Sequence, residues 1–152
     1  MSALLETQVR CSTFIRGDIE RVYDLFATAR GLDAWFTTGA TVDARAGGEI
    51  VYRWKDWGVD KVTTEARGRV HLVQPPHRFV FEWDSADVKP TTVEIDLQRA
   101  DGGTIVRLRE YGFENTPRGR QCLAQEASGW GEALTLVKFY VEHGLKYFGD
   151  SK

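Results

Sequence analysis

Hydrophobic and polar residues alternate along most of the chain, a pattern that predicts β-strands. A first strand is expected over residues 7–15, where Val9, Cys11 and Thr13 fall on one face. Further alternating segments cover residues 49–54, 62–73, 79–83, 91–97 and 104–110. Short turns join these later segments, so they predict an antiparallel meander.

Apolar residues at helical spacing interrupt the alternation in two places. Asp18 is placed to cap a helix of about three turns, which Gly31 interrupts, and residues 32–36 predict a short second helix. Thr116 and Pro117 predict the start of a helix of about seven turns. Its apolar stripe is expected to comprise Leu123, Ala127, Trp130, Leu134, Val137, Val141, Leu145 and Phe148. Its polar side is expected to carry Glu126, Glu132, Lys138, Glu142 and Lys146.

Strands and helices are segregated along the chain, which predicts the α+β class. The economical arrangement lays the long helix across the concave face of a curved antiparallel sheet of six to seven strands, with two short helices after the first strand. A strongly twisted sheet and a straight helix diverge along their length, so we expect a cavity between them. Six aromatic residues are expected to face it: Trp35, Tyr52, Trp54, Phe81, Trp83 and Trp130.

The chain of 152 residues has the size of one domain, which is expected to span residues 1–152. Its 20 basic and 22 acidic residues leave a net charge of -2, which argues against a dedicated nucleic-acid-binding protein. The sequence shows neither a signal-peptide pattern nor the roughly 18 consecutive apolar residues of a membrane span. We therefore expect a cytoplasmic protein that does not insert into membranes.

Five tryptophans in so short a chain raise the question of what their rings do. Large aromatic side chains fill cores, but they also line ligand pockets, so both roles are open. Trp57 falls in a predicted turn, Asp56-Trp57-Gly58, where an exposed ring would act as a lid or a dimer contact.

Glu110 occupies an unusual position for a carboxylate, because it follows Val106 and Leu108 on an inward strand face. A buried carboxylate either has a partner or has a raised pKa. Three roles stay open: a hydrogen bond to the polar tip of a nearby Trp or Tyr, a ligand contact, and general base catalysis. The three histidines and two cysteines show neither metal-ligand spacing nor a triad pattern, so no metal or other cofactor is expected.

Several short motifs occur in an order that resembles a known family. They are Leu32-Asp33-Ala34-Trp35-Phe36, Gly47-Gly48-Glu49-Ile50, Gly68-Arg69-Val70, Pro75-Pro76-His77-Arg78-Phe79, Glu110-Tyr111-Gly112-Phe113, and Gly129-Trp130 followed by Leu134. Over roughly residues 8–146 the chain resembles the START-like (SRPBCC) helix-grip proteins, in the group related to the C-terminal domain of the activator of heat-shock protein 90 ATPase. The resemblance implies a deep hydrophobic cavity between the sheet and the C-terminal helix.

Three hypotheses about function follow. The first, which we favour, is that the cavity binds an apolar or amphipathic small molecule, such as a lipid. On this hypothesis the protein is a binding protein and not an enzyme. The second is a chaperone-interacting module like the heat-shock protein 90 activators, and the third is a cyclase- or hydrolase-type enzyme that uses Glu110 with Tyr52. A homodimer is left open. The expected ligand-binding residues are Trp35, Tyr52, Trp54, Phe81, Trp83, Glu110, Trp130 and Leu134.

Overall fold

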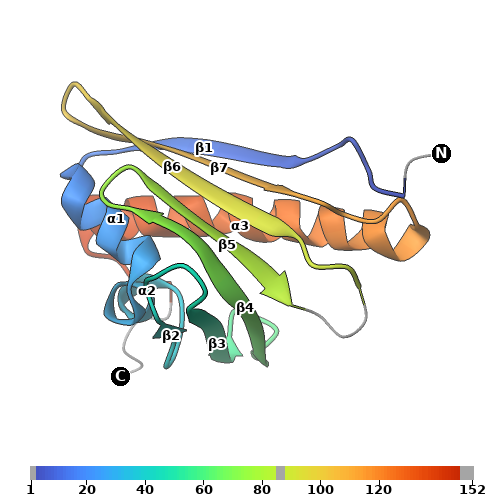
Figure 1. Ribbon diagram of the computed structural model, residues 1–152. Helices are drawn as coiled ribbons and strands as arrows, with labels where there is room; N and C mark the ends of the chain where they lie inside the picture. Colours follow the sequence, from blue (N-terminus) through green and yellow to red (C-terminus); the bar gives the residue numbers. More distant parts are fainter. Residues whose placement is uncertain (1–2, 85–87, 148–152) are drawn as a thin grey trace.

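The computed structural model describes residues 3–84 and 88–147, in which it contains seven strands and three helices (Figure 1). In chain order the elements are β1 (Val9–Ile15), α1 (Ile19–Ala27), α2 (Ala29–Trp35), β2 (Thr41–Val42), β3 (Glu49–Trp57), β4 (Val62–Gln74), β5 (Arg78–Asp84), β6 (Thr92–Ala100), β7 (Gly103–Tyr111) and α3 (Pro117–His143). The α+β class, the two short helices after the first strand and the long final helix are confirmed. The sequence also predicts a loop over residues 85–90, between the expected strands 79–83 and 91–97, of which residues 85–87 lie outside the described residues.

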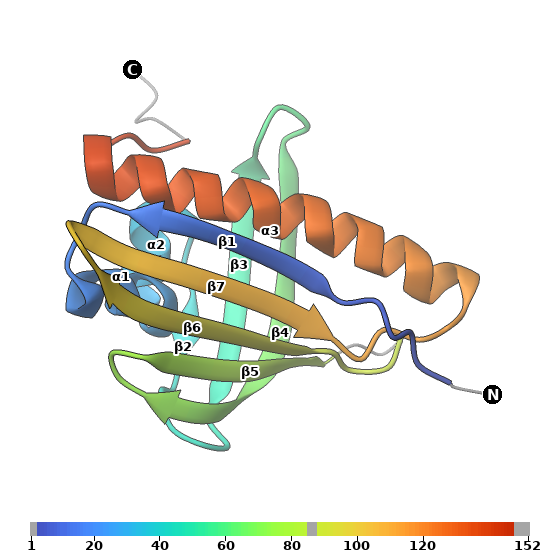
Figure 2. The same cartoon turned by 90° about the horizontal axis from the view of Figure 1, so that it is seen from above.

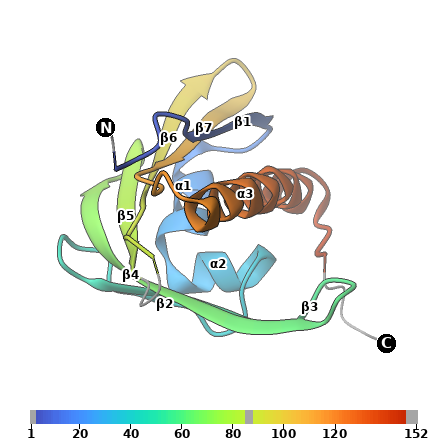
Figure 3. The same ribbon diagram turned by 90° about the vertical axis from the view of Figure 1, so that its right-hand side faces the viewer.

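The strands form one antiparallel sheet with the order β1-β7-β6-β5-β4-β3-β2. Figure 3 looks along α3 and shows the sheet curving around this helix, with α1 and α2 on the same concave side. In Figure 2, α3 runs nearly along β1 and β7 but across β3 and β4. The helix therefore packs closely against β1 and diverges from the strands at the other end of the sheet.

The core lies between the concave face of the sheet and the helices. Its fully buried side chains include Phe26 from α1, Ile95 from β6, Val106 from β7 and Val137 from α3. Burial of large apolar side chains such as these stabilises the fold by about 1.5–3 kcal/mol each. No helix within the described ranges is long and apolar enough to cross a membrane.

The break between the first two helices lies at Thr28, so the prediction that Gly31 interrupts the helix is wrong. The Thr28 hydroxyl accepts a hydrogen bond from the backbone N–H of Gly31, which makes Thr28 the N-cap of α2 (2.9 Å). Gly31 is required for another reason, because a Cβ atom there would lie 1.9 Å from the backbone oxygen of Asp24. Asp18 stands at the N-cap position of α1, but its side chain makes no capping hydrogen bond.

Strand β3 continues through Trp57, so the turn predicted at residues 56–58 begins later. The pairing of β3 with β4 shifts register between Trp54 and Trp57, and Asp56 takes a left-handed backbone conformation there (φ 51°). The Trp57 ring is half-buried, with centroids 5.9 Å from Phe36 and 5.1 Å from Tyr147. The prediction of an exposed ring is therefore wrong.

A glycine inside an expected strand, such as Gly68, predicts a bulge or bend, but the irregularity of β4 lies elsewhere. The pairing with β5 shifts between Val70 and Leu72, whereas Gly68 pairs regularly with Trp83. Gly68 is needed because a Cβ atom there would lie 2.0 Å from the backbone oxygen of Glu82. The glycine thus permits a close approach of two strands rather than a bulge.

Helix α3 begins as predicted, and it ends before the predicted apolar stripe does. The Thr116 hydroxyl accepts a hydrogen bond from Gly119 N–H (2.9 Å), and Gly144 ends the helix in a left-handed conformation. Leu145 therefore lies past the helix and is 60% exposed, while Phe148 lies outside the described residues. Glu142 and Lys146 stand in the i,i+4 order that predicts an ion pair on a helix, but α3 ends before Lys146 and Glu142 pairs with Lys138 and Arg16 instead.

Candidate functional site

A cavity of about 960 Å³ opens where α3 diverges from β3, β4 and β5. Side chains from these strands, from β7 and from the first half of α3 line it. Phe36, which follows α2, closes one side of it. The volume lies within the range of about 300–1,000 Å³ that small-molecule sites occupy.

Five of the eight predicted site residues line this cavity, and three do not. The lining residues are Tyr52, Trp54, Trp83, Glu110 and Trp130. Phe81 and Leu134 are buried in the core beside it. Trp35 is held in the core by α1, since its indole N–H donates to the backbone oxygen of Leu25 (2.9 Å) and its ring stacks on Phe36. A role for any of the eight in ligand binding stays a prediction.

The aromatic rings of the cavity stand at steep angles to one another. The Tyr52 ring meets Trp54 at 73°, Trp83 at 86° and Trp130 at 78°, with centroids 4.9 to 6.4 Å apart. Phe36 meets Tyr52 at 86°. Rings arranged in this way form walls around a space instead of a single stack, and Trp54 and Trp83 remain partly exposed.

Glu110 projects from β7 into the buried end of the cavity and is only 1% exposed. Its Oε2 atom accepts a hydrogen bond from the Thr91 hydroxyl (2.6 Å), and its Oε1 atom accepts one from the Trp130 indole N–H (2.8 Å). Of the three roles left open for Glu110, the structure therefore confirms the first, a hydrogen bond to the polar tip of a tryptophan. Burial raises the pKa of this carboxyl group, and its hydrogen bonds oppose the shift.

A second carboxyl group, that of Glu126 on α3, is hydrogen-bonded to Glu110. Burial, followed by the charge of Glu110 and this hydrogen bond, raises the pKa of Glu126 to about 9. At neutral pH Glu126 is therefore protonated and donates to Glu110. The prediction that Glu126 lies on the polar outer side of the helix is wrong. One signal for its true place was its position four residues before Trp130, which puts both side chains on one helix face.

Tyr52 brings a third polar group to the cavity. Its side chain is 1% exposed, and within the part of the chain that the structure describes its hydroxyl has no hydrogen-bond partner. Burial and then the charge of Glu126 raise the pKa of Tyr52 well above its usual range. Buried hydroxyl groups nearly always have a partner, so this one is available to a bound molecule.

Comparison with known families identifies the chain at this point. The model of the family described as Activator of Hsp90 ATPase homolog 1-like protein matches residues 16–142. The chain belongs to this family. The resemblance to the START-like helix-grip proteins is thereby confirmed, whereas a chaperone-activating role stays a prediction.

Solved structures of other proteins share the fold. The Aha1 dimer from Colwellia psychrerythraea is 19% identical with a TM-score of 0.72, and the match covers 91% of this chain and 98% of that one. The AHSA1-like protein from Aeromonas hydrophila is 24% identical with a TM-score of 0.71, covering 96% and 100%. DynU16, from the dynemicin biosynthetic locus, is 18% identical with a TM-score of 0.75, covering 92% of this chain and 49% of DynU16. No curated protein matches the sequence.

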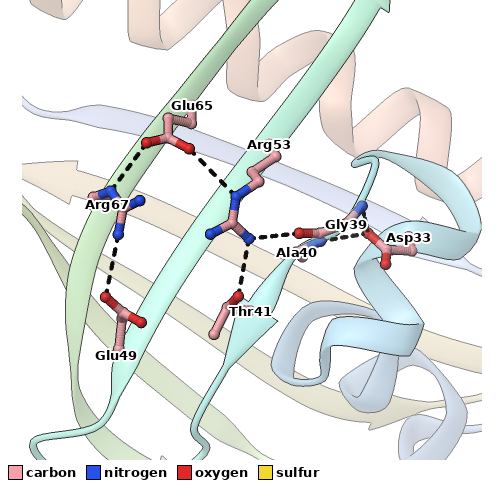
Figure 4. Close-up of polar contacts among 8 residues, drawn as sticks. All are labelled: Asp33, Gly39, Ala40, Thr41, Glu49, Arg53, Glu65 and Arg67. Carbon is pink, nitrogen blue, oxygen red and sulfur yellow. Dashed lines mark hydrogen bonds and ion pairs between the residues drawn. The ribbon is translucent and has the colours of Figure 1, made fainter.

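A network of ion pairs supports the cavity of this AHSA1-like chain from the other side of the sheet (Figure 4). Glu65 on β4 bridges Arg53 on β3 (3.3 Å) and Arg67 on β4 (3.1 Å). Arg53 also donates to the backbone oxygen of Gly39, whose N–H donates to Asp33 on α2. The network joins α2 to β4 and to β3, the strand that carries Tyr52 and Trp54, although each exposed pair contributes only about 0–1 kcal/mol.

The polar groups of the AHSA1-like site do not form a metal centre. No cluster of three or more His, Cys, Asp or Glu side chains with suitable geometry occurs among residues 3–84 and 88–147. The cavity instead combines aromatic walls with two coupled carboxyl groups and a buried hydroxyl. Such a combination of groups is chemically suited to contact an organic molecule or to transfer a proton.

Proposed function

We propose that this AHSA1-like protein binds an apolar or amphipathic small molecule, such as a lipid, in the cavity between α3 and the sheet. The observation that carries the proposal is the cavity of about 960 Å³ with aromatic walls, in a molecule whose core is otherwise closely packed. Concave sites of this size, lined mainly by apolar and aromatic side chains with a few polar groups, are where proteins bind small organic molecules.

The lining fits a ligand with an apolar body and at least one polar group. Trp54 and Trp83 supply partly exposed aromatic surface, whose burial by a ligand is favourable by roughly 25 cal/mol per Å². The unpartnered hydroxyl of Tyr52 supplies a directional contact at the buried end. DynU16 comes from a biosynthetic locus, which agrees with a small-molecule ligand, but its low identity supports only the common fold.

Two glycines on α3 give the test a matched pair of variants. A Cβ atom at either Gly129 or Gly131 would meet nothing within 4 Å, but only Gly129 lines the cavity. Gly129→Leu therefore places a side chain in the cavity, and Gly131→Leu makes the same substitution outside it. Both replacements raise helix propensity, so neither is expected to unfold α3.

The experiment is a fluorescence titration with the neutral apolar probe N-phenyl-1-naphthylamine. We expect saturable binding to the unmodified protein, at least tenfold weaker binding to Gly129→Leu, and binding to Gly131→Leu within twofold of the original. Absence of saturable binding, or equal binding to both variants, would contradict the proposal. Circular dichroism of each variant verifies that the fold is intact.

The Glu110–Glu126 pair favours a second candidate, which is acid–base catalysis in the same cavity. A carboxyl group that holds its proton at neutral pH can act as a general acid, and its neighbour can act as a general base. The pair replaces the predicted combination of Glu110 with Tyr52. If the cavity is catalytic, Glu126→Gln abolishes turnover of a bound ester or polyketide-like substrate while leaving its binding intact. Equal turnover by the unmodified protein and by Glu126→Gln would rule out acid–base catalysis by the pair.

A further inference from the structure

The buried end of the cavity is acidic. Glu110 and Glu126 share a proton there, and Glu114 and Glu132 add carboxylates along the lining. Among the described lining residues the basic side chains are Lys89 and Arg67, and the Arg67 guanidinium is engaged with Glu65 and Glu49 on the outer face of the sheet. Lys89 is exposed, whereas the pair lies at the buried end, so an anionic ligand group at the pair itself would meet like charge.

The aromatic walls stand around the same space as the carboxyl pair. Trp130 lines the cavity and hydrogen-bonds to Glu110 through its indole N–H, so its ring lies directly beside the pair. Tyr52, Trp83 and Trp54 continue the wall at steep mutual angles. A cation within about 6 Å of such ring faces is attracted by their electron density, most strongly by tryptophan.

The hydroxyl of Tyr52 completes the set of groups. It is buried, it lines the cavity, and none of the described residues hydrogen-bonds to it. The Tyr52 ring packs against the ring of Trp130 (centroids 6.4 Å), whose indole N–H donates to Glu110, so Tyr52 lies on the same side of the cavity as the pair. Its oxygen is free to accept a hydrogen bond from an N–H group held between it and the carboxyl groups.

We infer that the ligand carries a cationic nitrogen, an amine or a quaternary ammonium on an apolar body, which sits against the Glu110–Glu126 pair within the aromatic walls. The inference rests on the proposed ligand-binding function and names the chemistry of the ligand. Carboxylates supply the opposite charge, and the rings supply an apolar surface that still stabilises a cation.

The test compares two molecules of the same shape. Phenyltrimethylammonium and tert-butylbenzene differ by one nitrogen in place of one carbon, and therefore by one positive charge. Each is titrated against the protein bound to N-phenyl-1-naphthylamine at pH 8. We expect the cation to displace the probe at a concentration at least fivefold lower than its neutral isostere. Equal or weaker displacement by the cation would overturn the inference while leaving the proposed function intact.

Two variants that each remove one carboxyl group show whether the preference arises at the pair. Glu126→Gln retains a hydrogen-bond donor toward Glu110 but cannot ionise, so at pH 10, above the pKa of Glu126, its preference for the cation is expected to be at least fivefold lower than that of the unmodified protein, with tert-butylbenzene unchanged. Asp101→Asn, in the exposed turn between β6 and β7, is the control and is expected to alter neither affinity. An unchanged preference in Glu126→Gln would overturn the inference. Failure of the probe itself to bind would instead count against the proposed function.

Discussion

The carboxyl group of Glu126 on α3 donates a hydrogen bond to the carboxyl group of Glu110 on β7, across the buried end of the cavity. This contact joins the helix to the sheet where the two elements diverge. Because two carboxyl groups can be bonded to one another only when at least one is protonated, the contact depends on pH. It is also the polar contact that distinguishes this cavity from a simple apolar pocket.

The first prediction concerns the pH dependence of stability. Glu126 keeps its proton in the folded protein up to a pH of about 9, whereas a glutamate in the unfolded chain ionises near a pKa of about 4.3. Between these values unfolding releases a proton, so the folded state loses stability as the pH rises. We expect the free energy of unfolding of the unmodified protein to fall more steeply between pH 5 and pH 9 than that of Glu126→Gln. The difference in slope is at most about 1.4 kcal/mol per pH unit.

Urea denaturation at several pH values measures this difference. Glu132→Gln is a suitable control, since it changes an exposed carboxyl group on the same helix and should leave the slope as it is. Parallel curves for the unmodified protein and Glu126→Gln would show that the two carboxyl groups are not coupled.

The second prediction concerns the hydrogen bond that Trp130 donates to Glu110. Trp130→Phe keeps an aromatic ring but removes the indole N–H, which leaves a buried carboxylate oxygen without this donor. We expect a loss of about 1–3 kcal/mol in the free energy of unfolding. Trp54→Phe removes a partly exposed indole from the same cavity and should cost less than about 1 kcal/mol. Similar losses in the two variants would argue against a special role for the Trp130 contact.

The third prediction separates two glycines that both lie in helices. Gly31→Ala forces a Cβ atom to within 1.9 Å of the Asp24 backbone, so α1 and α2 must move apart. Gly129→Ala meets open space and improves helix propensity by roughly 1 kcal/mol. Thermal unfolding should therefore show a lowered melting temperature for Gly31→Ala and an unchanged or raised one for Gly129→Ala. A stable Gly31→Ala variant would contradict the close packing of the two short helices.

The fourth prediction concerns the pH dependence of cation binding. Phenyltrimethylammonium does not titrate, so any change in its affinity reports on the protein. Loss of the Glu126 proton creates a second negative charge, so affinity should rise between pH 6 and pH 9, by at most tenfold per pH unit. The other titratable residues that border the cavity are Tyr52, Glu65, Arg67, Asp84, Lys89, Glu110, Glu114, Cys122 and Glu132. The side chains of Glu65 and Arg67 pair with each other on the outer face of the sheet.

Glu126→Gln distinguishes the Glu126 carboxyl group from these other groups. The affinity of this variant for phenyltrimethylammonium should not change over the same range, and tert-butylbenzene should show no pH dependence with either protein. A rise of equal size in the variant would assign the effect to a different group.

Alternation along the strands was enough to predict which face each side chain of the sheet occupies. Tyr52, Trp54, Trp83 and Glu110 line the cavity because every second strand residue points to the concave face. The same rule places Phe81 on that face, but it does not tell which part of the face α1 and α2 cover. Phe81 lies in the core and not in the cavity. Which residues of the concave face line the cavity depends on the angle between α3 and the strands.

Glu126 shows why the polar part of the site was harder to predict. Polarity alone places a glutamate on the outer side of an amphipathic helix, although its spacing from Trp130 indicates the inner side. Glu126 lies on the inner side because Glu110 provides a partner for it there. Glu110 lies 16 positions earlier in the chain, on β7, and shares a proton with Glu126. Periodicity within one helix carries no information about such a partner.

The claim that this AHSA1-like protein binds a small molecule between α3 and the sheet is tested most directly by the indole N–H signals of its tryptophans. Single Trp→Phe variants assign these signals in a nitrogen–proton correlation spectrum, and the neutral amphipathic molecule 1-naphthol is then titrated at pH 7. The account predicts saturable shifts of the Trp54, Trp83 and Trp130 signals with one common dissociation constant. The Trp35 signal should stay in place, because its indole donates to Leu25 within the core. Unchanged signals from Trp54, Trp83 and Trp130, or an equal shift of Trp35, would contradict the account.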